Sequence, residues 1–186
     1  LNVLLSIEIS RPLNNPLSST SVITVLYWIV TLLWFSTTIS KVNTSPGTIL
    51  SITTSFSSIV IDVSGSMAGE KIMRLNSAMR GFINEFYHNP SIPSNVEFRL
   101  SVLPYSTEAQ WQYNTPVDLA CYKWIDLESS GLTNLAKPIS LLNMKLLDKE
   151  VVSSPLLSPL IVFITDGQPT DSYSKEYSLL KSNPVF

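Results

Sequence analysis

From Ser58 onward, apolar residues recur with two different periods, one typical of buried strands and one typical of helices. The run 58–62 (Ser-Ile-Val-Ile-Asp) is short and β-branched, as in a strand buried on both faces of a parallel sheet. Residues 70–87 place apolar side chains three and four positions apart, which predicts a helix with one face packed on that sheet. This stripe consists of Ile72, Leu75, Met79, Phe82, Ile83 and Phe86.

The alternation continues to the end of the chain. Residues 96–103 alternate with period two, which predicts a strand with one exposed face or a place near the sheet edge. The remaining predicted elements are a strand over 110–117, a helix over 134–149, a strand over 159–166 and a helix over 172–182. The strand 159–166 is the most apolar and is expected at the sheet centre. The helix 134–149 is expected to turn inward Leu135, Ile139, Leu142, Leu146 and Leu147, and Asp171 is expected to cap the last helix.

Strands that alternate with helices predict an α/β fold with a Rossmann-like, doubly wound, mostly parallel sheet and helices on both faces. In such sheets the ligand crevice lies beyond the carboxyl ends of the central strands. Because 186 residues suffice for one domain with a substantial core, we expect a domain over 58–186 preceded by an extension over 1–57.

The extension 1–57 is low in charge, since Lys41 is the only side chain between Arg11 and Asp62 that is charged at neutral pH. Residues 22–39 are long and apolar enough to cross a membrane as a helix. Three interpretations remain open: a membrane-spanning anchor, a cleaved secretory signal, or a translated segment that results from a wrongly placed gene start. Membrane anchoring through 22–39 is the favoured localisation, and a cytoplasmic protein is the alternative.

Composition excludes several classes of site. The net charge is −2 and the pI is near 5.3, and no cluster of Lys or Arg could neutralise a row of phosphates, so we expect no nucleic-acid partner. Cys121 and His88 are the only residues of their kinds. Cysteine-based metal sites within one chain and histidine-activated nucleophiles are therefore not expected.

Oxygen-bearing side chains gather where the predicted strands end. Asp62 ends the first predicted strand and Ser64 and Ser66 follow it, Asp166 ends the predicted strand 159–166, and Thr133 precedes a helix. Separately, each piece is also typical of a turn or a helix cap; together and in this order they predict one site. Hydroxyl and carboxylate oxygens suit a hard cation such as Mg²⁺ or Mn²⁺. Because only two of the five residues are acids, such an ion could still accept a carboxylate from a protein partner.

These residues also carry a resemblance. The segments Ile-Val-Ile-Asp62-Val-Ser64-Gly-Ser66-Met, Gly-Leu-Thr133 and Phe-Ile-Thr-Asp166-Gly-Gln-Pro-Thr-Asp resemble the metal-ion-dependent adhesion site of von Willebrand factor A domains. The last string is similar to the bacterial subgroup that includes tellurium-resistance-associated proteins. The resemblance implies direct ligation by Ser64, Ser66 and often Thr133, with Asp62 and Asp166 holding ligating waters or hydroxyls. It also implies binding rather than catalysis.

The sequence differs from the family pattern at its C-terminal end. Family domains usually continue past the helix after the Asp-Gly loop with another strand, another helix and commonly a final strand, so the domain is expected to be truncated at its C-terminal end. An exposed sheet edge and low stability would follow unless another chain covers the edge.

Three functions are carried forward. The preferred one is a non-enzymatic module that binds an acidic side chain of a protein partner through its cation. The second is a Mg²⁺-dependent phosphoryl-transfer enzyme with Asp62 as acceptor. The third is a membrane protein in which the segment 22–39 carries the function and the A-type domain is a degenerate remnant.

Overall fold

The computed structural model describes residues 3–8, 53–88, 96–148, 151 and 156–184. Within them the chain forms five strands and three α-helices. In chain order the elements are β1 (Val3–Glu8), β2 (Thr53–Asp62), the 3₁₀ turn η2 (Gly65–Met67), α2 (Glu70–His88), β3 (Val96–Tyr105), β4 (Val117–Asp118), the 3₁₀ turn η3 (Leu119–Cys121), α3 (Ala136–Leu147), β5 (Leu156–Thr165) and α4 (Ser174–Lys181).

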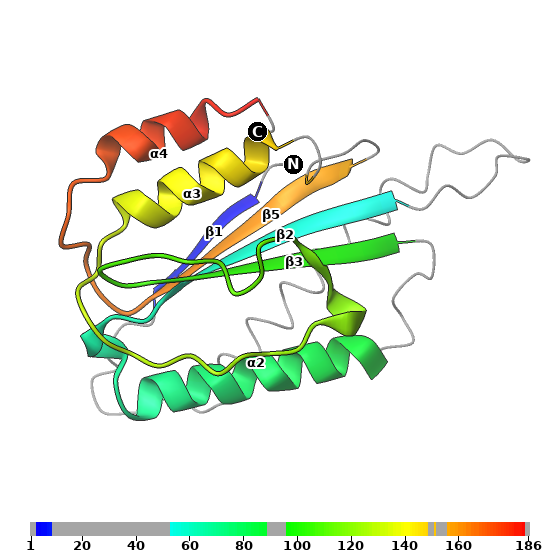
Figure 1. Cartoon of the computed structure of the whole chain (residues 1–186), viewed down its shortest axis with the longest axis horizontal. Coiled ribbons are helices and arrows are strands. Elements are labelled where there is room, and N and C mark those ends of the chain that lie inside the picture. The colour runs from blue at the N-terminus through cyan, green and yellow to red at the C-terminus, as the bar shows by residue number, and fades with distance from the viewer. Residues whose placement is uncertain (1–2, 9–52, 89–95, 149–150, 152–155, 185–186) are drawn as a thin grey trace, which may run out of the picture.

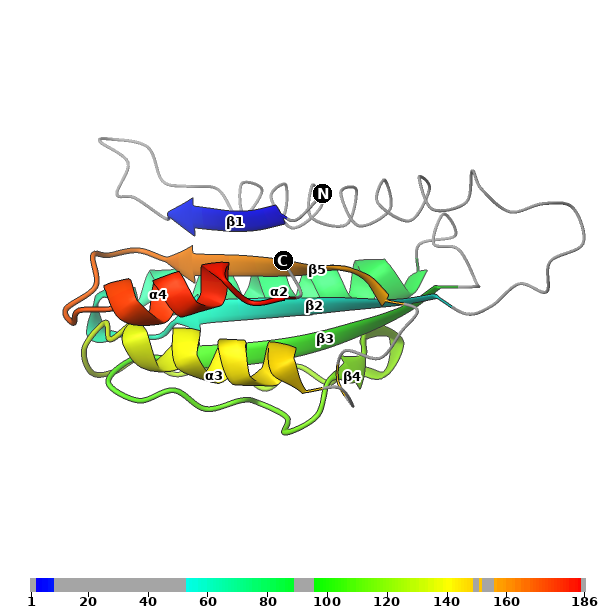
Figure 2. The ribbon, with the colours of Figure 1, turned by 90° about the horizontal axis from the view of Figure 1, so that it is seen from above.

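The strands form one sheet in the order β1-β5-β2-β3-β4. Every pairing is parallel except the short antiparallel contact between β3 and β4. The middle strand is β2, and β5 lies beside it between β1 and β2 rather than at the exact middle that its apolar sequence predicts. Figure 2 displays this order from β1 at one edge towards β4 at the other.

Helices cover both faces of the sheet, with α2 on one side and α3 and α4 on the other (Figure 1). Successive strand residues point to opposite faces, so β2 contributes Ile59 and Ile61 to the α2 side and Phe56 and Val60 to the other. The predicted apolar stripe of α2 is buried except for Ile83, which is partly exposed. The predicted α/β, mostly parallel, doubly wound fold is thus confirmed.

Two local predictions are wrong. The segment 110–117 is not a strand: Gln110 and Gln112 each donate one backbone hydrogen bond to a carbonyl of β3, but only Val117–Asp118 forms a strand paired with it. In α3, Leu147 is 52% exposed and Lys145 is buried in its place. The Lys145 ammonium donates a 2.8 Å hydrogen bond to the Asn114 carbonyl and lies 4.0 Å from the centroid of the Trp111 ring. Burial lowers the pKa of Lys145.

The N-terminal segment contributes a strand that the sequence pattern did not reveal. β1 pairs in parallel with β5 from Val3 opposite Leu160 to Glu8 opposite Thr165. The resemblance predicted an exposed sheet edge. Along these pairs, β1 covers that edge of β5. β2 begins at Thr53, so the expected boundary between residues 57 and 58 falls inside a strand.

The proposed membrane segment 22–39 lies outside the described residues. Within the described ranges, no helix combines the length and the apolar character needed to span a bilayer.

Candidate cation site at the carboxyl edge of the sheet

The two acids of the predicted site lie at the same edge of the sheet. β2 and β5 are parallel neighbours, with Ile61 opposite Ile164, so both strands end together. Asp62 is the last residue of β2, and Asp166 follows directly after the last residue of β5. The topology therefore brings together residues that are a hundred positions apart in the sequence.

Asp62 is completely buried and both of its carboxylate oxygens accept hydrogen bonds. The backbone N–H of Ser64 donates to Oδ1 at 2.8 Å, which closes a local turn. The hydroxyl of Thr165 donates to Oδ2 at 2.8 Å and so connects the ends of β2 and β5. Asp62 thus fixes the first loop and ties it to the second strand.

The two serines continue the connection towards Asp166. The hydroxyls of Ser64 and Ser66 lie 2.9 Å apart and share a hydrogen bond, and Ser66 donates to Oδ1 of Asp166 at 2.7 Å. Four of the five predicted ligands, Asp62, Ser64, Ser66 and Asp166, are therefore linked in one hydrogen-bonded chain.

Thr133, the fifth predicted ligand, is held beside this chain by its loop. It is 7% exposed, and its carbonyl accepts a 2.8 Å hydrogen bond from the N–H of Thr170 in the loop after β5. The carbonyl of Gly131 accepts a 3.0 Å bond from the N–H of Gly65 in the loop after β2. The Thr133 loop is thus bonded to both acid-bearing loops.

Gly131 is the residue that lets this loop pass. Its φ of +81° is unfavourable for other residues, and a Cβ there would lie 2.6 Å from Oγ1 of Thr107. The same Thr107 hydroxyl accepts a 3.0 Å hydrogen bond from the N–H of Leu132. A side chain at position 131 would therefore push the loop away from the site.

The prediction for Asp171 is wrong, because it caps α3 and not α4. Its two carboxylate oxygens accept hydrogen bonds from the N–H groups of Leu135 and Ala136, at 2.7 and 2.9 Å. At the start of α4, the N-cap residue Tyr173 makes no side-chain cap hydrogen bond. Asp171 thus supplies the acceptors that the first turn of α3 lacks locally, and it anchors the segment that follows Thr133.

Sequence reasoning missed Lys71 at this site. Its ammonium forms an ion pair with Oδ2 of Asp166 and donates a 3.1 Å hydrogen bond to the Ser66 carbonyl. The available signal was its place in the first turn of the predicted helix 70–87, because helices that follow strands begin at the edge where the strands end.

Tyr105, the last residue of β3, lies 1% exposed behind Asp62. Burial raises the pKa of its phenol, and the negative charge of Asp62 raises it further. Tyr105 therefore stays neutral at physiological pH and adds no charge to the edge.

The charges and donors define what the edge can do. Among the described residues, no group of three or more His, Cys, Asp or Glu side chains is placed to hold a metal ion. The edge offers two carboxylates and serine and threonine hydroxyls, all hard oxygen ligands, and one ammonium. This donor set is compatible with Mg²⁺ or Mn²⁺ and unsuited to thiophilic metals.

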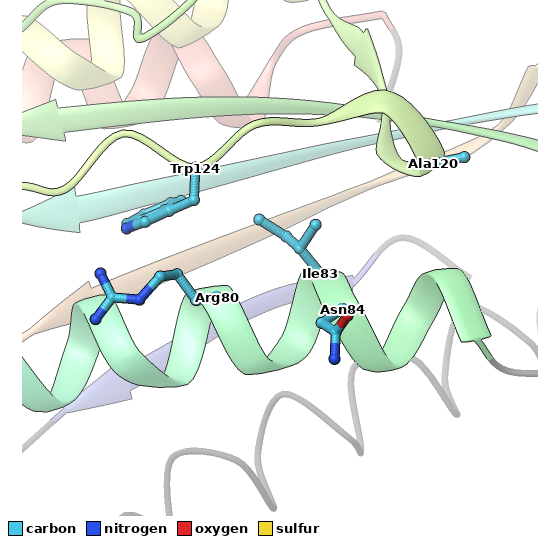
Figure 3. Close-up of a pocket in the computed structure, with 5 residues that line it drawn as sticks. All are labelled: Arg80, Ile83, Asn84, Ala120 and Trp124. Atoms are coloured by element: carbon cyan, nitrogen blue, oxygen red, sulfur yellow. The ribbon is translucent and has the colours of Figure 1, made fainter.

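A separate groove of about 410 Å³ lies between α2 and the segment after η3. Figure 3 labels its lining residues, Arg80, Ile83, Asn84, Ala120 and Trp124. Arg80 forms an exposed ion pair with Asp126. None of the five predicted cation ligands lines this groove, so it is not part of the candidate site.

Comparison with known proteins gives the family of the chain. The family model of the von Willebrand factor type A domain matches residues 58–186. The chain belongs to this family. Its members typically mediate protein interactions, and many of them bind a divalent cation.

Solved structures and curated proteins add less. The ArnB paralogue VWA2 from Sulfolobus acidocaldarius matches at 27% identity with a TM-score of 0.44, over 68% of this chain and 31% of that chain. The present chain thus spans about a third of that structure. No curated protein matches the sequence.

Proposed function

We propose that this von Willebrand factor A domain is a protein-binding module that holds one Mg²⁺ or Mn²⁺ ion at the carboxyl edge of its sheet. The ligand set is Asp62, Ser64, Ser66, Thr133 and Asp166. The partner is a protein that offers an acidic side chain. Membrane attachment through 22–39 and the likeness to the tellurium-resistance-associated subgroup belong to the same proposal.

The observation that carries the proposal is the hydrogen-bonded chain from Asp62 to Asp166. The hydroxyls of Ser64 and Ser66 and an Asp166 oxygen lie 2.7 to 2.9 Å from one another in sequence along this chain, and the Ser64 backbone N–H joins them to Asp62 at 2.8 Å. A preorganised set of hard donors reduces the entropy that is lost when an ion binds.

The charge count favours an ion that stays open to a further ligand. Two carboxylates neutralise a dication, and the remaining donors are uncharged hydroxyls. When bound, such an ion supplies a positive centre that can accept an external carboxylate in exchange for water. An exposed apolar side chain, Leu132, lies next to Thr133 and offers the partner a contact beside the acid.

The environment of Asp62 disfavours the phosphoryl-transfer alternative. A nucleophile needs a free oxygen that faces the substrate, whereas both oxygens of Asp62 accept hydrogen bonds and the side chain is buried. The position of Lys71 beside Asp166 favours the enzyme alternative, because an enzyme could use the lysine ammonium to bind the phosphate of a substrate. Turnover of a phosphate ester that disappears in Asp62→Asn would reverse our preference.

Calorimetric titration of the full chain with Mg²⁺ tests the metal part. We expect a single site in the wild type, no detectable site in Ser64→Ala, and unchanged binding in the control Asp126→Asn, whose carboxylate pairs with Arg80 away from the edge. The full chain is used because β1 pairs with β5. Absence of Mg²⁺ and Mn²⁺ uptake by the folded wild type and also by a folded Lys71→Gln variant, which lacks the ion pair with Asp166, would contradict the proposal.

Water-proton relaxation of the Mn²⁺-loaded chain tests the open position. Acetate serves as a probe for the acidic side chain of a partner. We expect acetate to lower the relaxation enhancement as it replaces a metal-bound water, and chloride at equal ionic strength to leave it unchanged. Equal responses to both anions would argue against carboxylate capture.

A further inference from the structure

Lys71 covers one of the two acids of the candidate cation site. Its ammonium is paired with Oδ2 of Asp166 while Ser66 donates to Oδ1, so both oxygens of that carboxylate are engaged. The Asp166 side chain has no exposed surface, whereas the Lys71 side chain is 32% exposed. A cation that arrives from solvent therefore meets Asp166 only after a group on it has moved, and Lys71 is the flexible one.

We propose that Lys71 is a tethered cation that competes with the divalent ion for Asp166 and so sets the metal affinity of the site. This inference rests on the proposed function and assigns to it a residue outside the ligand set. Lys71 lowers the affinity in two ways: it occupies Oδ2, and its positive charge repels a dication nearby.

The physical basis is electrostatic competition at one carboxylate. Lysine is a compact, strongly hydrated point charge on a flexible stem, so it can leave Asp166 for water at small cost. Its contact with Asp166 is partly exposed, and such pairs are weak enough to be exchanged. An ion present near its dissociation constant would then be retained better when a partner carboxylate adds a ligand, since metal and partner affinities are thermodynamically linked.

A structural role for Lys71 predicts the opposite sign. The ammonium also donates to the Ser66 carbonyl at 3.1 Å. If that contact were needed to hold the Ser66 loop in place, removal of Lys71 would loosen the ligand set and weaken metal binding. The direction of the change in affinity therefore distinguishes a competitor from a loop support.

Mg²⁺ titration calorimetry on the full chain compares the wild type with Lys71→Gln, Lys71→Met and Lys71→Arg, and with Lys175→Gln, an exposed lysine of α4, as the matched control. We expect Lys71→Gln and Lys71→Met to bind Mg²⁺ about tenfold more tightly, the effect of removing a unit charge a few ångström from a dication in a water-like dielectric. Lys71→Arg and Lys175→Gln should stay near wild type. Circular dichroism establishes that each variant is folded. Two neutral variants are used so that the test still stands if one of them does not fold.

The outcomes separate this inference from the proposed function. Tighter binding in the neutral variants supports the competitor role, also where the wild type binds too weakly to detect. Equal or weaker binding in the neutral variants, with a wild type that binds, overturns the role of Lys71 and leaves the metal site standing. If neither the wild type nor a folded neutral variant takes up Mg²⁺ or Mn²⁺, both the inference and the metal site are overturned.

Discussion

The two acids at the carboxyl edge differ in what surrounds them. Asp62, at the end of β2, is bound only by neutral donors, a backbone N–H and a threonine hydroxyl. Asp166, after β5, is bound by a serine hydroxyl and by the ammonium of Lys71. Asp62 thus serves the structure of the edge, and Asp166 is the acid that already meets a positive charge. Carboxylates that occupy similar places in a motif can therefore differ in their main role.

The largest effect is expected from Asp62→Ala. The substitution leaves the Ser64 N–H without its acceptor, and such a buried unpaired group costs about 1–3 kcal/mol. It also removes the link from β2 to the Thr165 hydroxyl, which keeps only the Gly167 carbonyl as acceptor. We predict a loss of about 3 kcal/mol in the free energy of unfolding by urea, together with loss of Mg²⁺ binding. Asp62→Asn keeps the shape and one acceptor, so it should lose less stability. Wild-type stability of Asp62→Ala would contradict the structural role.

Asp166→Asn should separate metal binding from folding. The amide oxygen can still accept from Ser66, but the negative charge is gone. We predict that Mg²⁺ affinity falls about a hundredfold by calorimetry. The free energy of unfolding should change by less than about 1 kcal/mol, because the lost ion pair with Lys71 is partly exposed. A loss of stability as large as that of Asp62→Ala would remove the distinction between the acids.

Asp171→Ala tests how the Thr133 loop is anchored. Loss of the acceptor for two N–H groups of α3 should cost about 1–2 kcal/mol in the free energy of unfolding. Mg²⁺ affinity should fall about tenfold, since Thr133 precedes the freed segment. Asp118→Ala is the matched control, because Asp118 accepts from the Ala120 N–H of the turn η3. That variant should keep wild-type Mg²⁺ affinity, and a parallel loss in both variants would contradict a specific anchor.

The smallest effect is expected from Ser101→Ala. Ser101 lies in β3 opposite Ser58 of β2, and both hydroxyls are buried without a hydrogen-bond partner among the residues that the structure describes. At the carboxyl edge, by contrast, the hydroxyls of Ser64 and Ser66 are hydrogen-bonded to each other, and Ser66 also donates to Asp166. Hydroxyls at the edge and in the strand interior therefore differ in whether they have partners. We predict that Ser101→Ala matches or exceeds wild-type stability, by up to about 1 kcal/mol in urea unfolding. A clear loss would mean that the interior hydroxyl has a stabilising contact.

The elements that the sequence predicted correctly are those with long regular patterns. The stripe from Ile72 to Phe86 has a helical period, and the run before Asp166 is apolar without interruption, short and rich in β-branched residues; both became the expected element. β1 escaped prediction because Val3–Glu8 lies in a stretch of Leu, Ile, Ser and Asn that has no clear period, and its partner is β5, more than 150 positions away.

The site could be predicted as a set of residues but not as a set of contacts. Asp62 ends β2, Ser64 and Ser66 follow it and Asp166 follows β5, and parallel topology brings such strand ends together. The contacts of Lys71 and Asp171 join residues far apart in the sequence: Lys71 forms an ion pair with Asp166, and Asp171 accepts hydrogen bonds from the first turn of α3. From the sequence alone, Asp171 is expected to cap the helix that follows it, α4. The folded arrangement of the loops instead places its carboxylate at the first turn of α3.

Anomalous scattering from a crystal of the full chain soaked in Mn²⁺ tests the central claim most directly. We predict one strong anomalous peak at the carboxyl edge, in contact with the hydroxyls of Ser64 and Ser66 and between the loops that carry Asp62, Thr133 and Asp166. No peak at this edge in a well-occupied, Mn²⁺-saturated crystal, or a peak only at a surface carboxylate such as Glu70, would contradict the account.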